Sequence, residues 1–298
     1  MNIAIISVNG FDFHPNMRLR QAAHARGHEV FLINPHEMTG IVKNNCFDFR
    51  IKDFTLKPDI ILPRQGSPMG EYGFVLLRQF MHLGIPLVNN IEGISIARNQ
   101  FMTLQRLCAA GISVPASCFI VEKDMLDLAV ESAGGYPVVI KQVDGMGGDG
   151  VIKADREDDA YDFLKKNLPA GKGLVVQQFI DPSDRIDLRF FVIGNKVAGA
   201  MKLESCTENF KTNIHQNGRA VPVNPDRTLE KIALQAAQAC CLEIAGVDMI
   251  IDSAGRPWVL EVNYSPGFRG LESVSGIDIA GKIIKYLDET WLNPDNAE

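Results

Sequence analysis

Three oxygen-bearing side chains toward the C-terminal end of the sequence are spaced like ligands of a divalent cation. Asp248 lies in an apolar run, 247–251, while Glu261 and Asn263 lie in or directly after a second run, 258–262. Residues two apart on a strand share a face, and a turn joining the two runs puts Asp248 opposite Glu261, within one residue of register. Facing carboxylates destabilise a strand pair unless a charge neutralises them. Because hard oxygen ligands suit magnesium, the spacing predicts a magnesium site on a β-hairpin.

A glycine-rich loop, 144–150, follows an apolar strand that contains Lys141. Its glycines match the pattern of dinucleotide-binding turns, but that pattern needs a helix directly after it, and a strand, 151–153, follows here. The segment predicts instead a flap over phosphates. Gly147 and Gly148 let backbone N–H groups approach the oxygens, and Lys141 supplies a point charge. A plain hairpin turn with a surface lysine is the alternative.

Further side chains with binding chemistry lie between the flap and the hairpin. Gln178 and Phe179 stand at a strand end that could offer backbone groups to an adenine. Asp187 and Arg189 alternate along one strand face, where a carboxylate suits a ribose hydroxyl and a guanidinium suits an anion. The alternatives are an ordinary strand end for Gln178 and Phe179 and a surface ion pair for Asp187 and Arg189. The polar segment 205–219 reads as a loop whose candidates for phosphate and substrate binding are Lys211, Asn213 and Arg219.

Alternating apolar runs and turn residues predict an α/β protein of three units, 1–92, 93–176 and 177–298. Near-continuous apolar strands with helical crossovers indicate a parallel sheet in the first unit. Its predicted strands are 2–8, 29–34, 58–63 and 86–89, and its helices are 16–26 and 69–83. The second unit has predicted helices at 94–110, 123–133 and 157–167, with strands at 116–121, 137–143 and 151–153. The third has strands at 189–193 and 196–202, helices at 226–245 and 277–292, and the hairpin of Asp248.

The bulk composition is that of an ordinary soluble globular protein. The 298 residues are 46% hydrophobic and 22% charged, and the net charge of −6 argues against nonspecific nucleic-acid binding. No apolar run approaches the roughly 20 residues of a membrane span, and residues 1–8 are expected to form a buried strand rather than a signal peptide. The six cysteines lack metal-type spacing and indicate reduced thiols in a cytoplasmic protein. His24 and His28 have metal-like spacing, but His28 follows a helix stop, so both are expected on the surface.

Read in order, these segments resemble the ATP-grasp ligases, and among them the RimK-like family of α-L-glutamate ligases. The resemblance covers nearly the whole chain. The segments that carry it are Pro-Arg-Gln-Gly (63–66), Ser-Ile-Ala-Arg (95–98), Val-Val-Ile-Lys (138–141), Asp-Leu-Arg (187–189), Phe-Lys-Thr-Asn-Ile-His (210–215), Ala-Gly-Val-Asp (245–248), Leu-Glu-Val-Asn-Tyr-Ser-Pro-Gly (260–267) and Gly-Ile-Asp-Ile-Ala-Gly-Lys (276–282). The resemblance implies an ATP-grasp fold in which a Rossmann-like parallel-sheet domain precedes two ATP-binding lobes of α+β type.

The resemblance also implies a role for each candidate residue. ATP would be bound by Lys141, Gly147, Gly148, Gln178, Phe179, Asp187, Lys211, Thr212 and Asn213. Magnesium, with two ions expected and manganese as an alternative, would be held by Asp248, Glu261 and Asn263. The acceptor and the reacting groups would meet Arg189, Arg219 and Arg269. Three positions depart from the family pattern: Gln100 replaces a common lysine, Gln178 replaces a glutamate, and Leu203 lies near the place of an arginine.

The implied reaction is an ATP-dependent carboxylate–amine ligation through an acyl phosphate. Its partners would be ATP, an amino acid such as L-glutamate, and a carboxylate on a protein C-terminus or small molecule, with neither nucleic acid nor membrane involved. A homo-oligomer is compatible with the family. The departures motivate one rival, an ATP-binding regulatory protein with lost or weak ligase activity. A kinase-type phosphotransferase is a weaker rival, because Lys141 precedes the glycine loop and neither a His-Arg-Asp nor an Asp-Phe-Gly segment is present.

Overall fold

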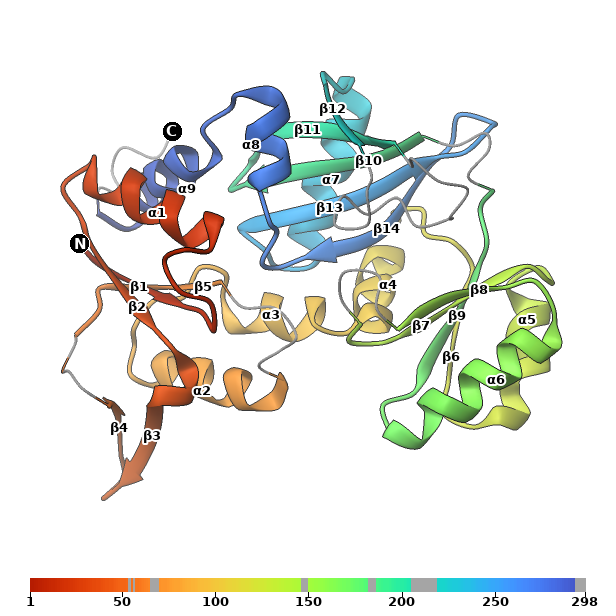
Figure 1. Ribbon diagram of the computed structural model, residues 1–298, viewed down its shortest axis with the longest axis horizontal. Helices are drawn as coiled ribbons and strands as arrows, with labels where there is room; N and C mark the ends of the chain where they lie inside the picture. Colours follow the sequence, from red (N-terminus) through yellow and green to blue (C-terminus); the bar gives the residue numbers. More distant parts are fainter. Residues whose placement is uncertain are drawn as a thin grey trace.

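The computed structural model describes residues 1–52, 55, 57–64, 70–145, 150–181, 186–204 and 219–292, without the side chains of Ala170, Arg219 and Leu292. Within these residues the strands form one parallel and three antiparallel sheets, with helices packed around them (Figure 1). No helix in the described part of the chain is long and apolar enough to cross a membrane.

The N-terminal sheet is parallel, as predicted, with strand order β2-β1-β5. Its strands are β1 (Asn2–Ile6), β2 (Glu29–Ile33) and β5 (Ile60–Pro63). Alternate residues of β1 face opposite helices: Ile3 and Ile5 pack in the core that includes α1 (His14–His24), and Ala4 and Ile6 pack in the core that includes α2 (Gly70–His82). The strand predicted at 86–89 is reduced to one bridge between Ile61 and Leu87.

An antiparallel hairpin beside this sheet was not predicted from the sequence. It consists of β3 (Met38–Lys43) and β4 (Cys46–Ile51). Its two-residue turn, Asn44 and Asn45, has both φ angles positive, 53° and 59°, which suits the twist of a tight hairpin. The side chain of Gln79 on α2 anchors it by donating to the carbonyls of Ile41 and Asp48 at 2.8 and 2.6 Å.

A second lobe contains a four-stranded antiparallel sheet of order β6-β9-β7-β8. Its strands are β6 (Ser117–Ile120), β7 (Val138–Gln142), β8 (Val151–Ala154) and β9 (Leu174–Gln178). The helices α5 (Leu126–Ser132) and α6 (Glu157–Asn167) lie together on one side of it (Figure 1) and close a core of its own. Because β9 runs to Gln178, this sheet passes the division expected between 176 and 177, and the domain boundaries stay a prediction.

The C-terminal lobe contains a five-stranded antiparallel sheet of order β12-β11-β10-β13-β14. Its strands are β10 (Ile186–Ile193), β11 (Lys196–Glu204), β12 (Arg219–Val223), β13 (Ile244–Ile251) and β14 (Pro257–Asn263). Phe190 packs in the core with α7 (Arg227–Ala239), and Phe191 packs on the opposite face with α9 (Ile279–Leu287). That second face also receives residues of β1 and α1, so the N-terminal unit and this lobe share one core.

Several helices differ from their predicted ranges. The helix predicted at 94–110 is two, α3 (Ile91–Ala97) and α4 (Gln100–Ala109), because Asn99 caps the second by accepting from the N–H groups of Phe101 and Met102. The helix predicted at 226–245 ends at Ala239. The helix predicted at 123–133 begins with a 3₁₀ turn, Lys123–Met125, and the one predicted at 277–292 is α9 followed by a π-helical segment, Asp288–Leu292.

Candidate functional site

The hairpin of β13 and β14 has the register that the sequence predicts. Asp248 is directly opposite Glu261, and Asn263 is opposite Gly246. The register shifts beyond Asp248, because Met249 pairs with Val259 and leaves Leu260 as an extra residue in a β-bulge. The amide of Gln100 at the start of α4 donates to the carbonyl of this bulged residue at 2.7 Å.

Gly246 allows a close approach beside this pair of strands. A Cβ atom at this position would lie 2.8 Å from Cβ of Pro266, well inside contact distance. The turn at 265–267 therefore packs directly over the hairpin of β13 and β14. It is tied from the other side by Arg64, whose Nη2 donates to the carbonyl of Pro266 at 2.6 Å.

Arg189 neutralises Asp248 in this structure. The two residues are paired across β10 and β13, and the guanidinium makes a two-point contact with the carboxylate, at 2.5 Å from Nε to Oδ1 and 2.6 Å from Nη2 to Oδ2. Burial acts to lower the pKa of Arg189, but the charge and hydrogen bonds of Asp248, with the charge of Glu261, raise it above its ordinary value. The side chains of Arg189 and Asp248 are 23% and 17% exposed, so this ion pair is largely shielded from solvent.

Glu261 carries the less compensated negative charge. Burial and the charge of Asp248 raise the pKa of its carboxyl group, while Lys141, Arg189 and a hydrogen bond from Asn263 act in the opposite direction. Asn263 also places Nδ2 at 3.4 Å from Oδ2 of Asp248. Lys141 comes from β7 of the second lobe, where its ammonium donates to Oε1 of Gln177 at 2.7 Å. Two carboxylates and two cations from four strands thus meet at one place.

The donor set fits a divalent cation. Two carboxylates and an amide oxygen are hard ligands on one face of a hairpin, and the raised pKa of Glu261 marks a site where added positive charge is favourable. Among the described residues no cluster of three or more His, Cys, Asp and Glu side chains is placed to hold a metal. Protein ligation here would therefore rest on the mixed set Asp248, Glu261 and Asn263.

The segment predicted to meet adenine leaves the second lobe at the end of β9. This strand lies between β6 and β7, and the N–H of Gln178 donates to the carbonyl of Ala116 at 2.8 Å. Phe179 lies just beyond the strand, and the ammonium of Lys153 lies over its ring, 4.8 Å from the ring centroid. An inner strand has its ladder groups paired, so backbone contacts to a base would come from the residues after Gln178.

A cavity of about 700 Å³ lies between the N-terminal unit and a wall formed by β10, β11 and the segment 267–270. Arg189 and Arg269 both line it, and Arg269 is the first residue of α8 (Arg269–Ser275), directly after the 265–267 turn. The opposite wall comes from the connection between β1 and α1, which includes Asp12, and from the first turn of α1, which begins at His14. The cavity is therefore lined by two arginines, one of which binds Asp248.

The structure describes only some of the remaining predicted site residues. Asp187 is buried on β10, where it pairs in register with Leu203 of β11 and Ile250 of β13. The predictions for the flap and the triphosphate segment fall outside the described residues, as does the side chain of Arg219. These residues are Gly147, Gly148, Lys211, Thr212 and Asn213.

Comparison with known proteins identifies the fold and the family. The RimK-like ATP-grasp domain matches residues 97–287, and the RimK PreATP-grasp domain matches residues 1–94. A probable alpha-L-glutamate ligase of Legionella pneumophila (strain Paris) is 36% identical over 291 residues, 97% of this chain and 96% of that protein. A RimK domain ATP-grasp protein from Sphaerobacter thermophilus DSM 20745 has a TM-score of 0.75 at 22% identity, covering 96% of this chain and 99% of the other. The ATP-grasp ligase PsnB, complexed with a minimal precursor, Mg and ADP, has a TM-score of 0.71 at 20% identity, covering 97% of each chain.

The fold consists of a parallel N-terminal sheet followed by two lobes with antiparallel sheets, and the last lobe contains the hairpin of Asp248 and Glu261. This arrangement is that of an ATP-grasp protein. The chain belongs to the RimK-like ATP-grasp family, and it is a ligase enzyme. The fold and enzyme class inferred from the sequence are thereby confirmed.

Proposed function

We propose that this enzyme joins an amino acid, L-glutamate or one similar to it, to a substrate carboxylate with ATP as the energy source. The names of the relatives support the amino acid. The observation that carries the proposal is the opposed pair of Asp248 and Glu261, with its raised carboxyl pKa, at the edge of a cavity lined by Arg189 and Arg269. The Mg and ADP of the PsnB complex support ATP and magnesium as ligands here.

Each residue has a defined task in this proposal. Asp248, Glu261 and Asn263 would hold magnesium, which supplies charge compensation for phosphoryl transfer when it is bound. Lys141 would bind a phosphate oxygen, with Gln177 fixing its ammonium. Arg269 would hold the substrate carboxylate in the cavity. Arg189 would hold the Asp248 carboxylate in place through its two hydrogen bonds, and would offer positive charge where an oxyanion develops.

The bond changes follow from the substrates. A carboxylate oxygen takes the γ-phosphoryl group of ATP, giving an acyl phosphate and ADP. The amine then attacks the carbonyl carbon, the C–O bond to phosphate breaks, and inorganic phosphate leaves with the electron pair. One of the original carboxylate oxygens ends in the phosphate.

The test is isotope transfer coupled to product analysis. The purified enzyme is given ATP, magnesium, L-glutamate and a panel of ¹⁸O-labelled carboxylates, and the products are followed by mass spectrometry. We expect ADP and amide in equal amounts and one ¹⁸O atom in the released phosphate. Labelled glutamate added to a cell extract would identify the natural acceptor by the same readout.

Two outcomes would overturn the proposal. Tight ATP binding without ADP release for any pair of substrates would mean a regulatory ATP-binding protein. A phosphorylated product or phosphoprotein with no amide would mean a phosphotransferase.

A further inference from the structure

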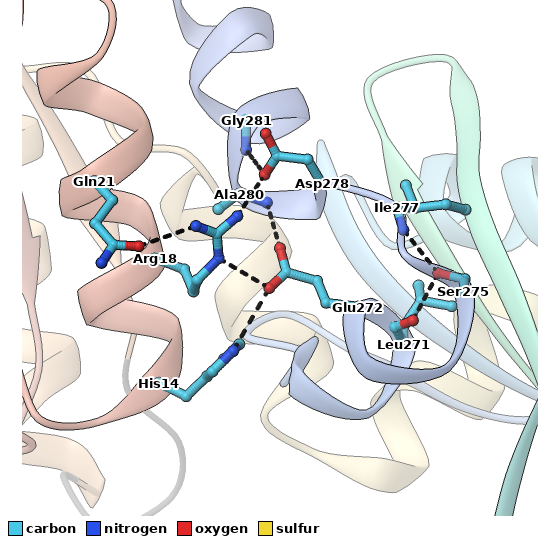
Figure 2. A network of polar contacts seen from close by, with 10 residues as sticks. All are labelled: His14, Arg18, Gln21, Leu271, Glu272, Ser275, Ile277, Asp278, Ala280 and Gly281. Atoms are coloured by element: carbon cyan, nitrogen blue, oxygen red, sulfur yellow. Dashed lines mark hydrogen bonds and ion pairs between the residues drawn. The ribbon is translucent and has the colours of Figure 1, made fainter.

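The hairpin of Asp248 and Glu261 is joined to the rest of the molecule differently on its two sides. On the N-terminal side, Arg18 of α1 donates to Glu272 of α8 and to Asp278 at the start of α9, at 3.2 and 2.9 Å (Figure 2). These contacts hold the N-terminal unit against the helices that follow the hairpin. On the other side, β14 is the last strand of its sheet, and contacts from both ends of α4 lie along its outer edge.

The β-bulge of β14 places its extra residue, Leu260, directly before Glu261. Val259 and Val262 are both buried in the core that includes α7, although they are three residues apart. Regular alternation would put them on opposite faces of the sheet. The bulge therefore allows Glu261 to lie opposite Asp248 while both valines stay in the core. Bulges beside active sites commonly re-aim a side chain in this way.

A bulge disrupts the ladder of backbone hydrogen bonds, and the side chain of Gln100 binds at this point. Its Nε2 donates to the carbonyl of Leu260 at 2.7 Å. That carbonyl belongs to the same planar peptide unit as the N–H of Glu261. The bond therefore fixes the backbone from which the Glu261 side chain extends. A second contact on the same edge is made by the N–H of Val259, which donates to the carbonyl of Ser113 at 2.9 Å.

Gln100 is itself fixed, because it is the first residue of α4. Its backbone N–H donates to the carbonyl of Val143 at 2.8 Å, and the next two N–H groups of the helix donate to the side chain of the N-cap Asn99. Val143 directly follows β7, the strand of Lys141, and packs in a small core with Leu104 of α4. Gln100 therefore binds β14 through its side chain and the end of the Lys141 strand through its backbone.

We propose that Gln100 is the positioning residue of the metal ligand Glu261. The inference rests on the proposed function, in which Glu261 binds magnesium. A metal ligand needs further contacts that orient it, and loss of one such contact typically weakens metal binding by about 10- to 100-fold. Gln100 supplies this contact through the backbone, at the one residue of β14 that has no counterpart on β13. Because its amide is neutral, it holds the strand without adding a positive charge that would repel the cation.

The test measures metal binding without turnover. Manganese(II) is titrated into the enzyme with ADP present, and the electron paramagnetic resonance signal of the free ion gives the amount bound. Gln100→Met keeps an unbranched side chain of similar helix propensity but removes the donor. We expect manganese affinity to fall by about 10- to 100-fold. Binding of ADP in EDTA should be unchanged, because Lys141 is held by Gln177 and the bond to Val143 uses only the backbone of residue 100. Gln105→Met, the same substitution at an exposed position of α4, should match wild type.

A double-mutant cycle tests whether Gln100 acts through Glu261. Glu261→Gln alone should weaken manganese binding, and adding Gln100→Met should weaken it no further, because the ligand to be positioned is already lost. An equal loss in both backgrounds, or wild-type manganese affinity in Gln100→Met, would overturn the role of Gln100. Parallel losses of manganese binding and of ADP binding in EDTA would overturn it too, since they indicate a general structural defect. Wild-type manganese affinity in Glu261→Gln would instead overturn the metal site of the proposed function, and the inference with it.

Discussion

The facing carboxylates of Asp248 and Glu261 give the site its unbalanced charge. Arg189 makes two hydrogen bonds to Asp248, so Glu261 is left with weaker compensation and a raised carboxyl pKa. An acid whose pKa is raised in the folded state stabilises the fold below its unfolded pKa, and that contribution is lost as the pH rises through the folded pKa. At neutral pH the protein without metal therefore carries a free-energy penalty at Glu261, and a cation bound there would reduce it.

The substitution Glu261→Gln tests this at the residue scale. Without metal, the variant should unfold at the same temperature as wild type or a higher one, because the like charge is gone. Magnesium should raise the midpoint of wild type but not of the variant, and ATP turnover should fall at least about 1000-fold, the loss expected when a main electrostatic contribution disappears. Thermal unfolding with and without magnesium, together with ADP release, provides both measurements.

Glu243→Gln is the matched control. Glu243 also has a carboxyl pKa raised by burial, but it accepts from the hydroxyl of Tyr286 at 2.6 Å, outside the hairpin that holds the site. It should keep the magnesium effect and turnover. A Glu261→Gln enzyme that turns over normally at ordinary magnesium would remove Glu261 from the metal site.

At the scale of elements, one buried amide fixes where the hairpin of β13 and β14 begins and ends. Asn89 accepts from the N–H groups of Glu243 and Ile244 at 2.8 and 2.7 Å and donates to the carbonyls of Ile244 and Tyr264 at 2.7 and 2.8 Å. It therefore joins the first residue of β13 to the residue that follows β14. Because it belongs to the N-terminal unit, it also sets the hairpin relative to the parallel sheet.

Asn89→Ala should lower the free energy of unfolding by about 3 kcal/mol or more, since several buried backbone groups lose their partners at roughly 1–3 kcal/mol each. Urea denaturation measures this. The neighbouring Asn90 is exposed and caps α3, so Asn90→Ser, which keeps a capping oxygen, should change stability by less than about 0.5 kcal/mol. Equal small losses in both variants would show that Asn89 does not tie the hairpin.

The turn of the hairpin provides a pH-dependent prediction. Hydrogen bonds from Trp258 and from the N–H of Arg256 lower the pKa of Asp252 to about 2. An acid with a lowered folded pKa stabilises the fold above its unfolded value of about 3.9 and loses that effect as the pH falls through the folded value. Asp252→Asn should therefore lower the thermal midpoint at pH 7, and its difference from wild type should close between about pH 4 and 2.

The control for the turn is Asp155→Asn, which removes an exposed carboxylate that pairs with Lys153. It should shift the midpoint little at any pH. If the difference in thermal midpoint between Asp252→Asn and wild type stayed constant down to pH 2, the charge of Asp252 would not stabilise the turn.

Local sequence signals predicted some of these elements correctly and missed others. The register of Asp248 and Glu261 follows from two apolar runs and a turn, all local signals. The Asn44–Asn45 turn was an available hairpin signal, since asparagine tolerates positive φ, but the strands beside it are largely exposed and show no clear alternation. The helix predicted to reach 245 ends at Ala239 with Cys241 at φ 55°. Because no glycine directly follows Ala239 to signal the end of the helix, the residues after it were predicted to continue the helix.

The residues that the sequence left unassigned depend on long-range contacts. Arg64 meets Pro266, which is 202 residues further along the chain, and Asn89 meets Tyr264, 175 residues away. His28 was expected on the surface but is buried against Asp288, 260 residues away. No spacing rule connects such positions, because only the packed fold brings them together.

At the scale of the whole molecule, the two ends of the chain share a core. Ile3, Ile5 and Leu19 from the N-terminal unit pack in the same cluster as Ile284 and other residues of α9, while the second lobe has a separate cluster that contains Leu164. Arg26 and His28 bind Asp288 directly after α9 and reinforce the closure. The N-terminal unit and the C-terminal lobe should therefore open together, and the lobe that carries Lys141 should open by itself.

Hydrogen exchange in two cavity variants tests this division. Ile284→Ala, which should cost about 2–5 kcal/mol, is expected to speed amide exchange in β1 and α1 as well as in α8 and α9, and to leave β6–β9 unchanged. Leu164→Ala, a truncation of an equally buried residue, should do the reverse. If Ile284→Ala speeds exchange in α9 alone, the shared core does not couple the two ends of the chain. The expected result would mean that the second lobe can move as a unit while β1 and α1 stay fixed relative to α8 and α9.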